Sequence, residues 1–397
     1  MTRISLTRAV ECAIELGVPL GVEHVPLDAC AGRVLAEEIE HAADLPPFDH
    51  AAMDGYAIAG AAARGRSFVV ESESRAGAPA ASALPGAAVA ISTGAAIPAG
   101  VDTVVPWEDV ERTADRITLT RDARAGQHVR RAGEDARRGE RALGGGVRLA
   151  GRHVALLATL ERRDVAVHLR PRVEVLTTGD ELRDPGSEVR PGSIVDSNGP
   201  MLAALVAQAG GRARVTRVPD REGALVAALD ARREDADLIV TVGGAADGQH
   251  DHVLRALEVL GAERTFRGVA IKPGKPVALS RLGGLPLLAL PGNPGSAFVT
   301  FVLLGIPLLR RLGGERDVAA PRRLARAGAP LRAPADRAAL VYGVLAVHDD
   351  ELVFTPAPPS SSGSVVGLAR ASAIAIVPPG EERSAGARVD IVEVDVA

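Results

Sequence analysis

The sequence predicts a multidomain protein of the α/β plus β class, built around a central doubly wound sheet. Residues 171–315 alternate apolar strand-like runs with helical runs, which is typical of a mostly parallel sheet covered by helices on both faces. Residues 56–145 and the region after residue 320 contain short strand-like runs separated by Gly, Pro and Ala, which is typical of β domains. A chain of 397 residues has room for two to four domains at about 100–200 residues each.

The composition excludes several other classes of protein. Hydrophobic residues make up 47% of the chain and charged residues 24%, as in globular proteins, so global disorder is excluded. The two cysteines, Cys12 and Cys30, cannot form a disulfide-rich scaffold or a four-cysteine zinc site. The formal net charge of −4 lacks the basic excess of a protein that coats nucleic acid, so we expect no nucleic-acid partner.

No segment is expected to span a membrane. The longest apolar stretch, residues 297–309, is shorter than the about 20 residues that a spanning helix needs. Residues 1–17 carry Glu11 and Glu15 inside their apolar pattern, which favours an amphipathic helix over a signal peptide. We therefore expect a cytoplasmic protein without a membrane partner.

The N-terminal part is expected to be mixed in structure. Helical periodicity predicts a helix over residues 4–17 and a second, short one over residues 31–39. A loop rich in Pro, Asp and Gly follows at 44–58, and residues 151–160 predict a further helix. Strands are predicted between these helices at SFVVESES (67–74), AAVAIST (87–93), TVVPWEDVE (103–111) and RITLT (116–120).

The central and C-terminal regions give clearer signals. The first central helix has a marked start at Ser197 or Asn198 and a marked end at Gly210. Helices are predicted within 193–211, 221–235, 250–261 and 293–312, between strands at 173–179, 213–219, 237–244, 269–282 and 285–292. Further strands are predicted at 340–347, 351–356, 373–378 and 389–394.

Lysine is almost absent from this chain. Of the 46 Lys and Arg residues, only Lys272 and Lys275 are lysines, and both fall in the tetrapeptide KPGK. A lysine ammonium is a compact point charge and an arginine a planar fork, so a site shaped for one rejects the other. Chance is the alternative explanation, but the pairing indicates a site that needs two ammonium groups.

Three turns of the predicted sheet carry residues suited to chemistry. In an open α/β sheet, ligands bind beyond the carboxyl ends of the strands. The turn TTGDEL places Asp180 and Glu181 directly after a strand, and the glycine-rich turn VGGAADGQHD ends in Asp251. The third turn, LPGNPGS, leads into the N-terminus of an apolar helix, where free N–H groups favour an oxyanion.

Together these turns predict a site for a phosphorylated ligand or another tetrahedral oxyanion, bridged by a metal. Mg²⁺ sites usually use one or two carboxylates plus substrate phosphates. Glu181 and Asp251 are the stronger metal candidates, because Asp180 could simply serve as a cap. His250 and His252 lack a partner cluster and are expected at the rim. The chain contains no GxGxxG after the first central strand and no GxxxxGK[ST].

Eight segments in order add a family resemblance over nearly the whole chain. They are PPFDHAAMDGYAI, STGAAIPAGVDTVV, RRAGEDARRGE, RPRVEVLTTGDEL with the following PGSIVDSN, TVGGAADGQHD, IKPGKPVAL, LPGNPGSAFVTF and SSGSVVGLARASAIAIVPPG. Together they resemble the molybdopterin molybdenumtransferase family, of the MoeA and gephyrin E-domain type. No single segment would suffice, but eight in the family's order are a specific signal.

The resemblance implies an arrangement of four domains. A discontinuous N-terminal hinge domain (1–45 with 140–170) carries an inserted β domain (46–139). A molybdopterin-binding α/β domain (171–315) and a C-terminal β-barrel-like domain (320–397) follow. Family members are homodimers whose cleft lies between the α/β domain of one subunit and the inserted β domain of the other.

The implied reaction is the insertion of molybdate into adenylylated molybdopterin, with Mg²⁺-dependent release of AMP, in molybdenum cofactor biosynthesis. Contact with the molybdopterin adenylyltransferase is a further possibility. The resemblance assigns catalytic roles to Asp54, Asp135, Glu181 and Asp251, and metal binding to Glu181, Asp220 and Asp251. The candidates for substrate binding are Thr93, Gly243, Gly244, Lys272, Lys275, Pro291, Asn293, Pro294 and Ser296.

Two alternatives to this enzyme remain at the level of sequence. One is a non-catalytic molybdopterin-binding or scaffold paralogue, and the other is a pyrophosphate-bond hydrolase on the same α/β domain. Departures from the family's pattern bear on them: Ala51 and Ala246 stand where the family often has Ser, and Asp247 adds a carboxylate. From the pattern alone, Asp54, Thr93 and Asp135 would be assigned to turns and solvated charge.

Overall fold

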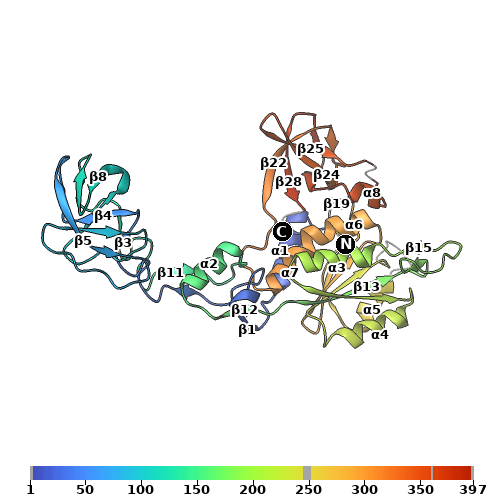
Figure 1. Ribbon diagram of the computed structural model, residues 1–397. Helices are drawn as coiled ribbons and strands as arrows, with labels where there is room; N and C mark the ends of the chain where they lie inside the picture. The colour runs from blue at the N-terminus through green and yellow to red at the C-terminus, as the bar shows by residue number, and fades with distance from the viewer. Residues whose placement is uncertain (1–2, 245–251, 359–360, 395–397) are drawn as a thin grey trace. The chain divides into compact units, whose positions relative to one another are not determined.

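The computed structural model describes residues 3–244, 252–358 and 361–394. The chain divides into two compact units, which are described separately (Figure 1). The first unit comprises the residues up to 37, residues 145–158 and the residues from 162 onward. The second unit comprises residues 38–144 with 159–161.

In the part of the chain that the structure describes, the central sheet of the first unit has six strands in the order β16-β13-β17-β21-β20-β18. The first four strands are parallel, and β20 and β18 join antiparallel at one edge. The predicted doubly wound, mostly parallel sheet is confirmed. The strands are β13 Arg172–Thr178, β16 Arg212–Val218, β17 Leu238–Val242, β18 Glu263–Arg267, β20 Ala278–Leu282 and β21 Leu285–Leu290.

Helices cover both faces of this sheet (Figure 1). One face packs against α1, α3 and the helix formed by α6 and α7, and the other packs against α4 and α5. The buried residues of β17 are divided between the two cores, since Leu238 and Val240 face one and Ile239 faces the other. The first four helices are α1 Leu6–Leu16, α3 Asn198–Gln208, α4 Glu222–Arg232 and α5 His252–Val259.

The last helix of the α/β domain runs continuously from Pro294 to Leu312. It consists of α6 (Pro294–Thr300), the π-helical turn η3 (Phe301–Gly305) and α7 (Ile306–Leu312). This helix is long and apolar enough to cross a membrane, but 83% of its most apolar window is buried inside the structure. It is therefore a core helix.

The C-terminal part of the first unit is a small barrel. Its strands follow the order β24-β25-β22-β28-β26, and the pairing of β26 with β24 closes the sheet. Phe354 and Ile391 are fully buried in its core. The strands are β22 Arg322–Ala327, β24 Ala338–His348, β25 Glu351–Pro356, β26 Ala373–Val377 and β28 Arg388–Glu393, with the short pair β23 Leu331–Arg332 and β27 Glu382–Arg383 and the helix α8 Val365–Leu368 nearby.

The KPGK segment differs from the prediction of one continuous strand over residues 269–282. Only Ile271 and Lys272 form a strand, β19, and it pairs with β24 of the barrel instead of the central sheet. The chain then turns, with the Val277 N–H donating to the carbonyl of Gly274 at 3.1 Å, before β20 begins. The two prolines of KPGKP explain the break, because neither can donate a ladder hydrogen bond.

The short helix expected over residues 31–39 is also not observed. This segment forms a turn, the isolated bridges Val34↔Arg148 and Leu35↔Val167, and the strand β2 (Ile39–Glu40). Val34 and Leu35 are buried, so tertiary pairing overrides the helical propensity of this short run. Beside it lie the two-stranded sheet of β1 (Val22–Pro26) and β12 (Asp164–His168), and the helix α2 (Gly151–Thr159).

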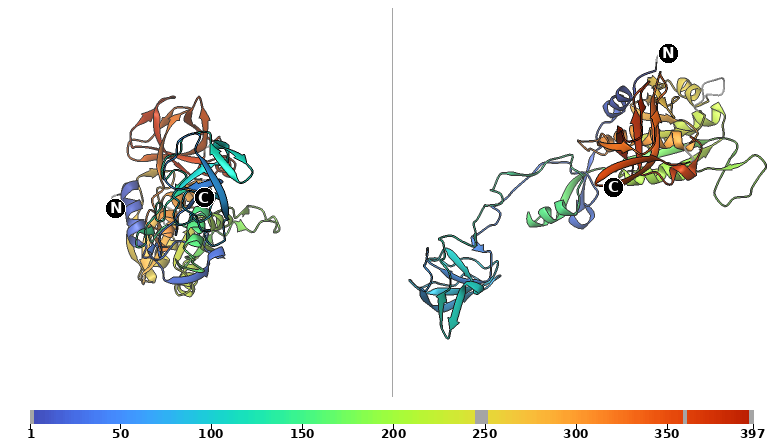
Figure 2. Two further views of the ribbon diagram at one scale, coloured as in Figure 1. Left: turned by 60° about the vertical axis from the view of Figure 1, so that its left-hand side comes forward. Right: turned by 90° about the horizontal axis from the view of Figure 1, so that it is seen from above.

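The second unit is an all-β body, seen in blue to cyan in both views of Figure 2. Its main sheet has the order β7-β4-β6-β5-β9-β8. Tyr56, Phe68 and Ile117 are buried in its core. The strands are β4 Gly55–Ile58, β5 Ser67–Ser74, β6 Ala88–Ile91, β7 Thr103–Pro106, β8 Val110–Thr113 and β9 Arg116–Leu119, with the short pairs β3 His50–Ala51 with β10 Val129–Arg130 and β2 with β11 Arg141–Leu143.

Candidate functional site

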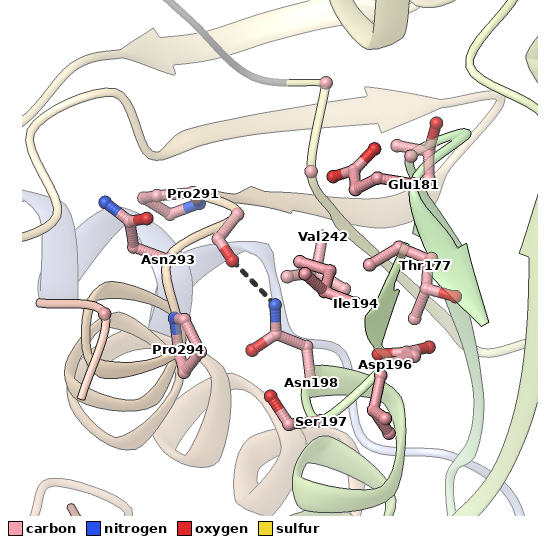
Figure 3. A pocket seen from close by; sticks show the side chains of 18 of the residues that line it. Thr177, Glu181, Ile194, Asp196, Ser197, Asn198, Val242, Pro291, Asn293 and Pro294 are labelled. Carbon is pink, nitrogen blue, oxygen red and sulfur yellow. Dashed lines mark hydrogen bonds between the residues drawn. The ribbon is translucent and has the colours of Figure 1, made fainter. Parts of the chain in front are cut away.

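A cavity of about 660 Å³ lies beyond the carboxyl ends of β13, β17 and β21. The helices α3 and α6 both begin at its wall (Figure 3). This is the edge of an α/β sheet where ligands bind, because strand ends and helix N-termini leave backbone N–H groups available there. The residues that line it are Thr177, Thr178, Gly179, Glu181, Leu182, Ile194, Val195, Asp196, Ser197, Asn198, Asp220, Val242, Gly243, Gly244, Pro276, Pro291, Gly292, Asn293, Pro294, Gly363 and Val365.

Carboxylates gather on the β13 side of the cavity. Glu181 lies in the turn after β13, and Asp220 follows the neighbouring strand β16. The Thr178 hydroxyl donates to Asp220 Oδ1 at 3.0 Å, and the Asp220 N–H donates to Asp180 Oδ1 at 3.2 Å. The parallel pairing Thr178↔Val218 brings the two strand ends side by side, which explains how residues 40 apart in sequence come together.

Glycine is required at the turn after β17. Gly243 has φ +96°, and a Cβ atom there would lie 2.3 Å from the carbonyl oxygen of Thr178. A Cβ on Gly292, from the turn after β21, would lie 3.4 Å from the Cα of Gly243, so these two turns approach closely. The glycine at 243 therefore allows the ends of β13 and β17 to approach closely, and the turn after β21 packs against it in ordinary contact.

Two asparagines organise the opposite side. The Asn198 Nδ2 group, at the start of α3, donates to the carbonyl of Gly292 at 2.7 Å (Figure 3). Among the described residues, the buried Oδ1 atom of Asn198 has no hydrogen-bond partner. Asn293 precedes α6 and donates through Nδ2 to the Ser362 hydroxyl at 3.3 Å. Asn198 therefore fixes the LPGNPG turn and keeps an unsatisfied acceptor beside the cavity.

The segment that precedes α8 completes the wall. Ser362 accepts the Gly295 N–H through its carbonyl at 2.8 Å, and the Tyr342 hydroxyl donates to the carbonyl of Ser361 at 2.7 Å. Burial raises the pKa of Tyr342, which favours the protonated phenol that donates this bond. These bonds attach the C-terminal barrel to the start of α6 and place Gly363 at the cavity.

The second unit contains its own organised cluster. The Asp54 carboxylate accepts both the backbone N–H of Thr93 at 2.7 Å and its hydroxyl at 3.0 Å. Asp135 accepts from Arg130 Nη2 at 2.6 Å. Asp49 accepts from the Ala132 N–H at 2.8 Å and from Arg131 at 2.6 Å, and these bonds lower the pKa of that carboxyl.

Three family models match the chain in sequence. Residues 4–160 match the MoeA N-terminal region (domain I and II), and residues 174–311 match a probable molybdopterin-binding domain. Residues 324–394 match the MoeA C-terminal region (domain IV). The matches cover both units that the structure describes.

Relatives match most of the chain in single alignments. A molybdopterin molybdenumtransferase from Nostoc is 35% identical over 372 residues, which cover 90% of this chain and 85% of that protein. The chain belongs to the molybdopterin molybdenumtransferase (MoeA) family. A second relative of that name, from Haemophilus influenzae, is 36% identical over 307 residues, or 76% of each chain. A MoeA crystal structure from Pyrococcus horikoshii superposes with a TM-score of 0.86 at 27% identity, covering 99% of this chain and 100% of that one.

The structure brings together some of the residues predicted for a MoeA protein. Glu181, Asp220, Gly243, Gly244, Pro291, Asn293 and Pro294 all line the same cavity. Ser296 is instead buried inside α6, where its carbonyl accepts from the Thr300 hydroxyl. Asp54, Thr93 and Asp135 lie in the other unit. Asp251, Ala246 and Asp247 are outside the described residues.

The two lysines are not placed at the same cavity. Lys272 lines a second cavity of about 370 Å³, with Arg332 and Tyr342 among its neighbours. Lys275 is half-buried in the following turn, next to Pro276 of the first cavity. The sequence also missed Asp196, Asn198 and Gly363. The rarity of asparagine, which occurs only at 198 and 293, is a signal that could have identified Asn198.

The carboxylates of the cavity suit a Mg²⁺ ion that takes its other ligands from water and from the substrate. Among the described residues, no group of three or more His, Cys, Asp and Glu side chains could hold a metal ion. The cavity does offer Glu181 and Asp220, with Thr178 orienting the latter. Two carboxylates suit an ion that takes its remaining ligands from water and substrate phosphates, as Mg²⁺ commonly does.

Proposed function

We propose that this chain inserts molybdate into adenylylated molybdopterin, with Mg²⁺-dependent release of AMP. The observation that carries the proposal is the cavity of about 660 Å³, which is lined by the glycine turns after β17 and β21, the starts of α3 and α6, and the carboxylates Glu181 and Asp220. Such a wall can bind phosphate oxygens and also position a metal against them. The volume of this cavity falls in the usual range of ligand pockets, roughly 300–1,000 Å³. It is therefore large enough for a ligand of the size of a nucleotide-capped pterin.

The residues of the cavity suggest how the substrate is oriented. The glycine turns after β17 and β21 would accept the phosphoanhydride, because they allow its oxygens to approach the backbone. The unpartnered Oδ1 of Asn198 would accept a hydrogen bond from a donor group of the pterin. Lys272 and Lys275, which belong to the KPGK segment and do not line this cavity, would attract molybdate, a tetrahedral dianion.

Glu181 and Asp220, with Asp251, would hold Mg²⁺, whose role when bound is to polarise the phosphoanhydride as a Lewis acid. The chain's own part is positioning. The Thr178 hydroxyl holds Asp220 in one orientation, and the Asp180 carboxylate fixes the backbone of the same turn. These contacts reduce the reorganisation needed when the substrate binds.

The second unit would supply Asp54, Thr93 and Asp135 to the cleft of a partner subunit. The two bonds from Thr93 fix the Asp54 carboxylate in one orientation, as expected of a functional group rather than a solvated loop. This assignment makes the working form a homodimer. We also propose a cytoplasmic location, the four-domain division given above, and contact with the molybdopterin adenylyltransferase that supplies the substrate.

The test is incubation of the purified protein with adenylylated molybdopterin, Mg²⁺ and varied molybdate. Molybdate-dependent release of AMP supports the proposal. Tight pterin binding without AMP release would contradict it and favour the scaffold. AMP release from other nucleotides, unaffected by molybdate, would favour the hydrolase.

A further inference from the structure

Asp196 is a buried carboxylate in the wall of the candidate cavity. It follows the short strand β15 (Ile194–Val195), comes just before α3, and is only 7% exposed. Its Oδ1 atom accepts the Gly199 N–H at 3.0 Å. It lines the same cavity as Glu181 and Asp220, the two carboxylates assigned to the metal, but has no part in that assignment.

The charge of Asp196 is not balanced by a cation of the chain. Among the described residues, Asp196 forms no ion pair, and the Gly199 N–H is the donor that its side chain receives. Arg183, in the strand β14 (Leu182–Arg183) that pairs with β15, accepts the Asp196 N–H through its carbonyl at 2.9 Å. The guanidinium of Arg183 donates instead to the carbonyl of Ser187 at 3.1 Å. A carboxylate removed from water is costly without partners, so Asp196 indicates donors that come from a ligand.

Two further polar atoms of this wall lack partners. Among the residues that the structure describes, the buried Thr177 Oγ1 and Asn198 Oδ1 atoms make no hydrogen bond, and both residues line the cavity (Figure 3). A Cβ atom on Gly199 would lie 3.0 Å from Asp196 Oδ2 and 3.2 Å from Thr177 Cγ2, so these two side chains flank one glycine. Because buried polar atoms are rarely left without partners, this wall is suited to a ligand that supplies several hydrogen-bond donors.

We propose that Asp196 binds the pterin ring of the substrate through the ring's 2-amino group and N3–H, and thereby determines which heterocycle this wall accepts. The inference rests on the proposed function, which supplies a pterin as substrate. The 2-amino group and N3–H are neighbouring donors that point the same way, like two N–H groups of an arginine, and a carboxylate can accept both. Adenine offers no such pair, because the N1 atom beside its 6-amino group is an acceptor. A ring without these donors would leave the buried acceptors unpaired and be rejected.

The test measures binding of molybdopterin and of AMP to the full-length protein by isothermal titration calorimetry. In Asp196→Asn, the side-chain oxygen can still accept the Gly199 N–H, but an NH2 group replaces the second acceptor. Molybdopterin affinity should fall about 10- to 100-fold, as expected for a lost charge-assisted hydrogen bond, and AMP affinity should not change. The matched control is Asp184→Asn, an exposed carboxylate outside the cavity, which should bind both ligands like the parent protein.

Kinetics separate a role in pterin binding from a role in metal binding. In Asp196→Asn, KM for adenylylated molybdopterin should rise by the same factor, with little change in kcat. The Mg²⁺ concentration for half-maximal AMP release should stay that of the parent. A higher Mg²⁺ requirement at unchanged molybdopterin affinity would assign Asp196 to the metal and overturn the proposal. If Asp196→Asn does not fold, Asp196→Ser retains an oxygen that can accept the Gly199 N–H and should lose molybdopterin affinity to the same extent.

The remaining outcomes distinguish this inference from the proposed function. Equal molybdopterin affinity in the parent and the variants at position 196 would overturn the inference alone. Guanine carries the same pair of donors, so tighter binding of GMP than of molybdopterin by the parent would assign the wall to a guanine nucleotide and also overturn it. A parent protein that binds molybdopterin but releases no AMP would contradict the proposed function, while the titrations would still decide the role of Asp196.

Discussion

The carboxylate of Asp220 is held in place by a hydroxyl rather than by a cation. In Asp220→Asn, the side-chain oxygen can still accept the hydrogen bond from the Thr178 hydroxyl, so the fold should be retained while the charge is lost. Because a charged ligand to the metal contributes most in the transition state, Asp220→Asn should lower kcat for AMP release about 100-fold or more, roughly 2.7 kcal/mol. Pterin affinity should change only slightly. The kinetics of AMP release measure kcat, and a titration with pterin measures the affinity.

The matched control for this variant is Asp180→Asn. Asp180 is exposed and only accepts the Asp220 N–H, which an Asn oxygen can still do. Its kcat should therefore stay close to that of the parent. Equal losses of kcat and pterin affinity in Asp220→Asn would show a general binding role and contradict its assignment to the metal.

Asp49 makes the stability of the second unit depend on pH. Its pKa is lowered mainly by the Ala132 N–H and next by Arg131. A lowered pKa stabilises the folded form above the ordinary value of 3.8, and this contribution disappears as the pH falls through the folded pKa. Asp49→Asn should therefore lower the free energy of unfolding at pH 7 by about 0.5–1 kcal/mol, allowing for solvent screening.

The fluorescence of Trp107, the single tryptophan, reports on this unit during denaturant unfolding. The difference between parent and Asp49→Asn should shrink progressively below about pH 4. A difference that stays constant from pH 7 to pH 3 would mean that the carboxylate's charge is not the stabilising feature.

The rarity of a residue type did not by itself place a residue at the site. Asn293 was identified from its turn and does lie at the cavity. Asn198 was noted only as a helix start, and its bond to Gly292 depends on a segment 94 positions away. The position of Lys272 at a different cavity follows from the pairing of β19 with the barrel, which no local pattern encodes.

At the scale of elements, the turn after β17 is the most sensitive point of the site. A Cβ on Gly243 would overlap the Thr178 carbonyl at 2.3 Å, and its φ of +96° strains any other residue. Gly243→Ala should therefore destabilise the protein by about 2–4 kcal/mol and abolish AMP release. Thermal unfolding and kinetics measure both effects.

Gly223→Ala provides the matched substitution. Gly223 lies in α4, and a Cβ atom added there would have no neighbouring atom within 4 Å, so alanine should be neutral or stabilising by up to about 1 kcal/mol. Were Gly243→Ala to behave like Gly223→Ala, the close approach of the β13 and β17 ends would be wrong.

The Tyr342 phenol is one of the groups that hold the segment between Ser361 and Gly363. Tyr342→Phe removes the hydroxyl that holds the Ser361 carbonyl and should cost about 1 kcal/mol of stability. Since this segment forms part of the cavity wall, KM for the pterin substrate should rise several-fold with little change in kcat. Tyr56→Phe is the control, because the Tyr56 hydroxyl only accepts a long 3.4 Å bond from Arg112 in the other unit. A fall in kcat at unchanged KM would instead place Tyr342 in the chemistry.

Elements with strong periodicity were predictable and short ones were not. The apolar strands β13, β17 and β21 and the helices between them follow directly from their patterns. The segment 31–39 was predicted as a helix because Val34 and Leu35 lie in a helix-forming context, yet both residues pair with distant strands. The barrel's contribution to the cavity through Gly363 could not be predicted, since it depends on tertiary contacts between Ser362 and Gly295.

At the scale of the whole molecule, the proposed catalytic residues are divided between two units. Asp54 lies in one unit and Asp220 in the other. If the working cleft combines units from different subunits, each site takes Asp54 from one subunit and Asp220 from the other. Either Asp54→Asn or Asp220→Asn then inactivates a site, but each does so from a different subunit. Each homodimeric variant should be inactive, whereas a mixed dimer contains one site with both substitutions and one site with neither.

Mixing the two variants under conditions that exchange subunits should therefore restore activity. Random exchange places about half of the subunit pairs in mixed dimers, and each mixed dimer has one functional site of two, so about a quarter of the parent AMP release should return. Mixing either variant with itself provides the control and should restore nothing. A mixture that exchanges subunits, as shown by mass spectrometry of differently labelled chains, but stays inactive would show that each subunit builds its site alone. That result would remove Asp54 from the partner's cleft while leaving the assignment of Asp220 intact.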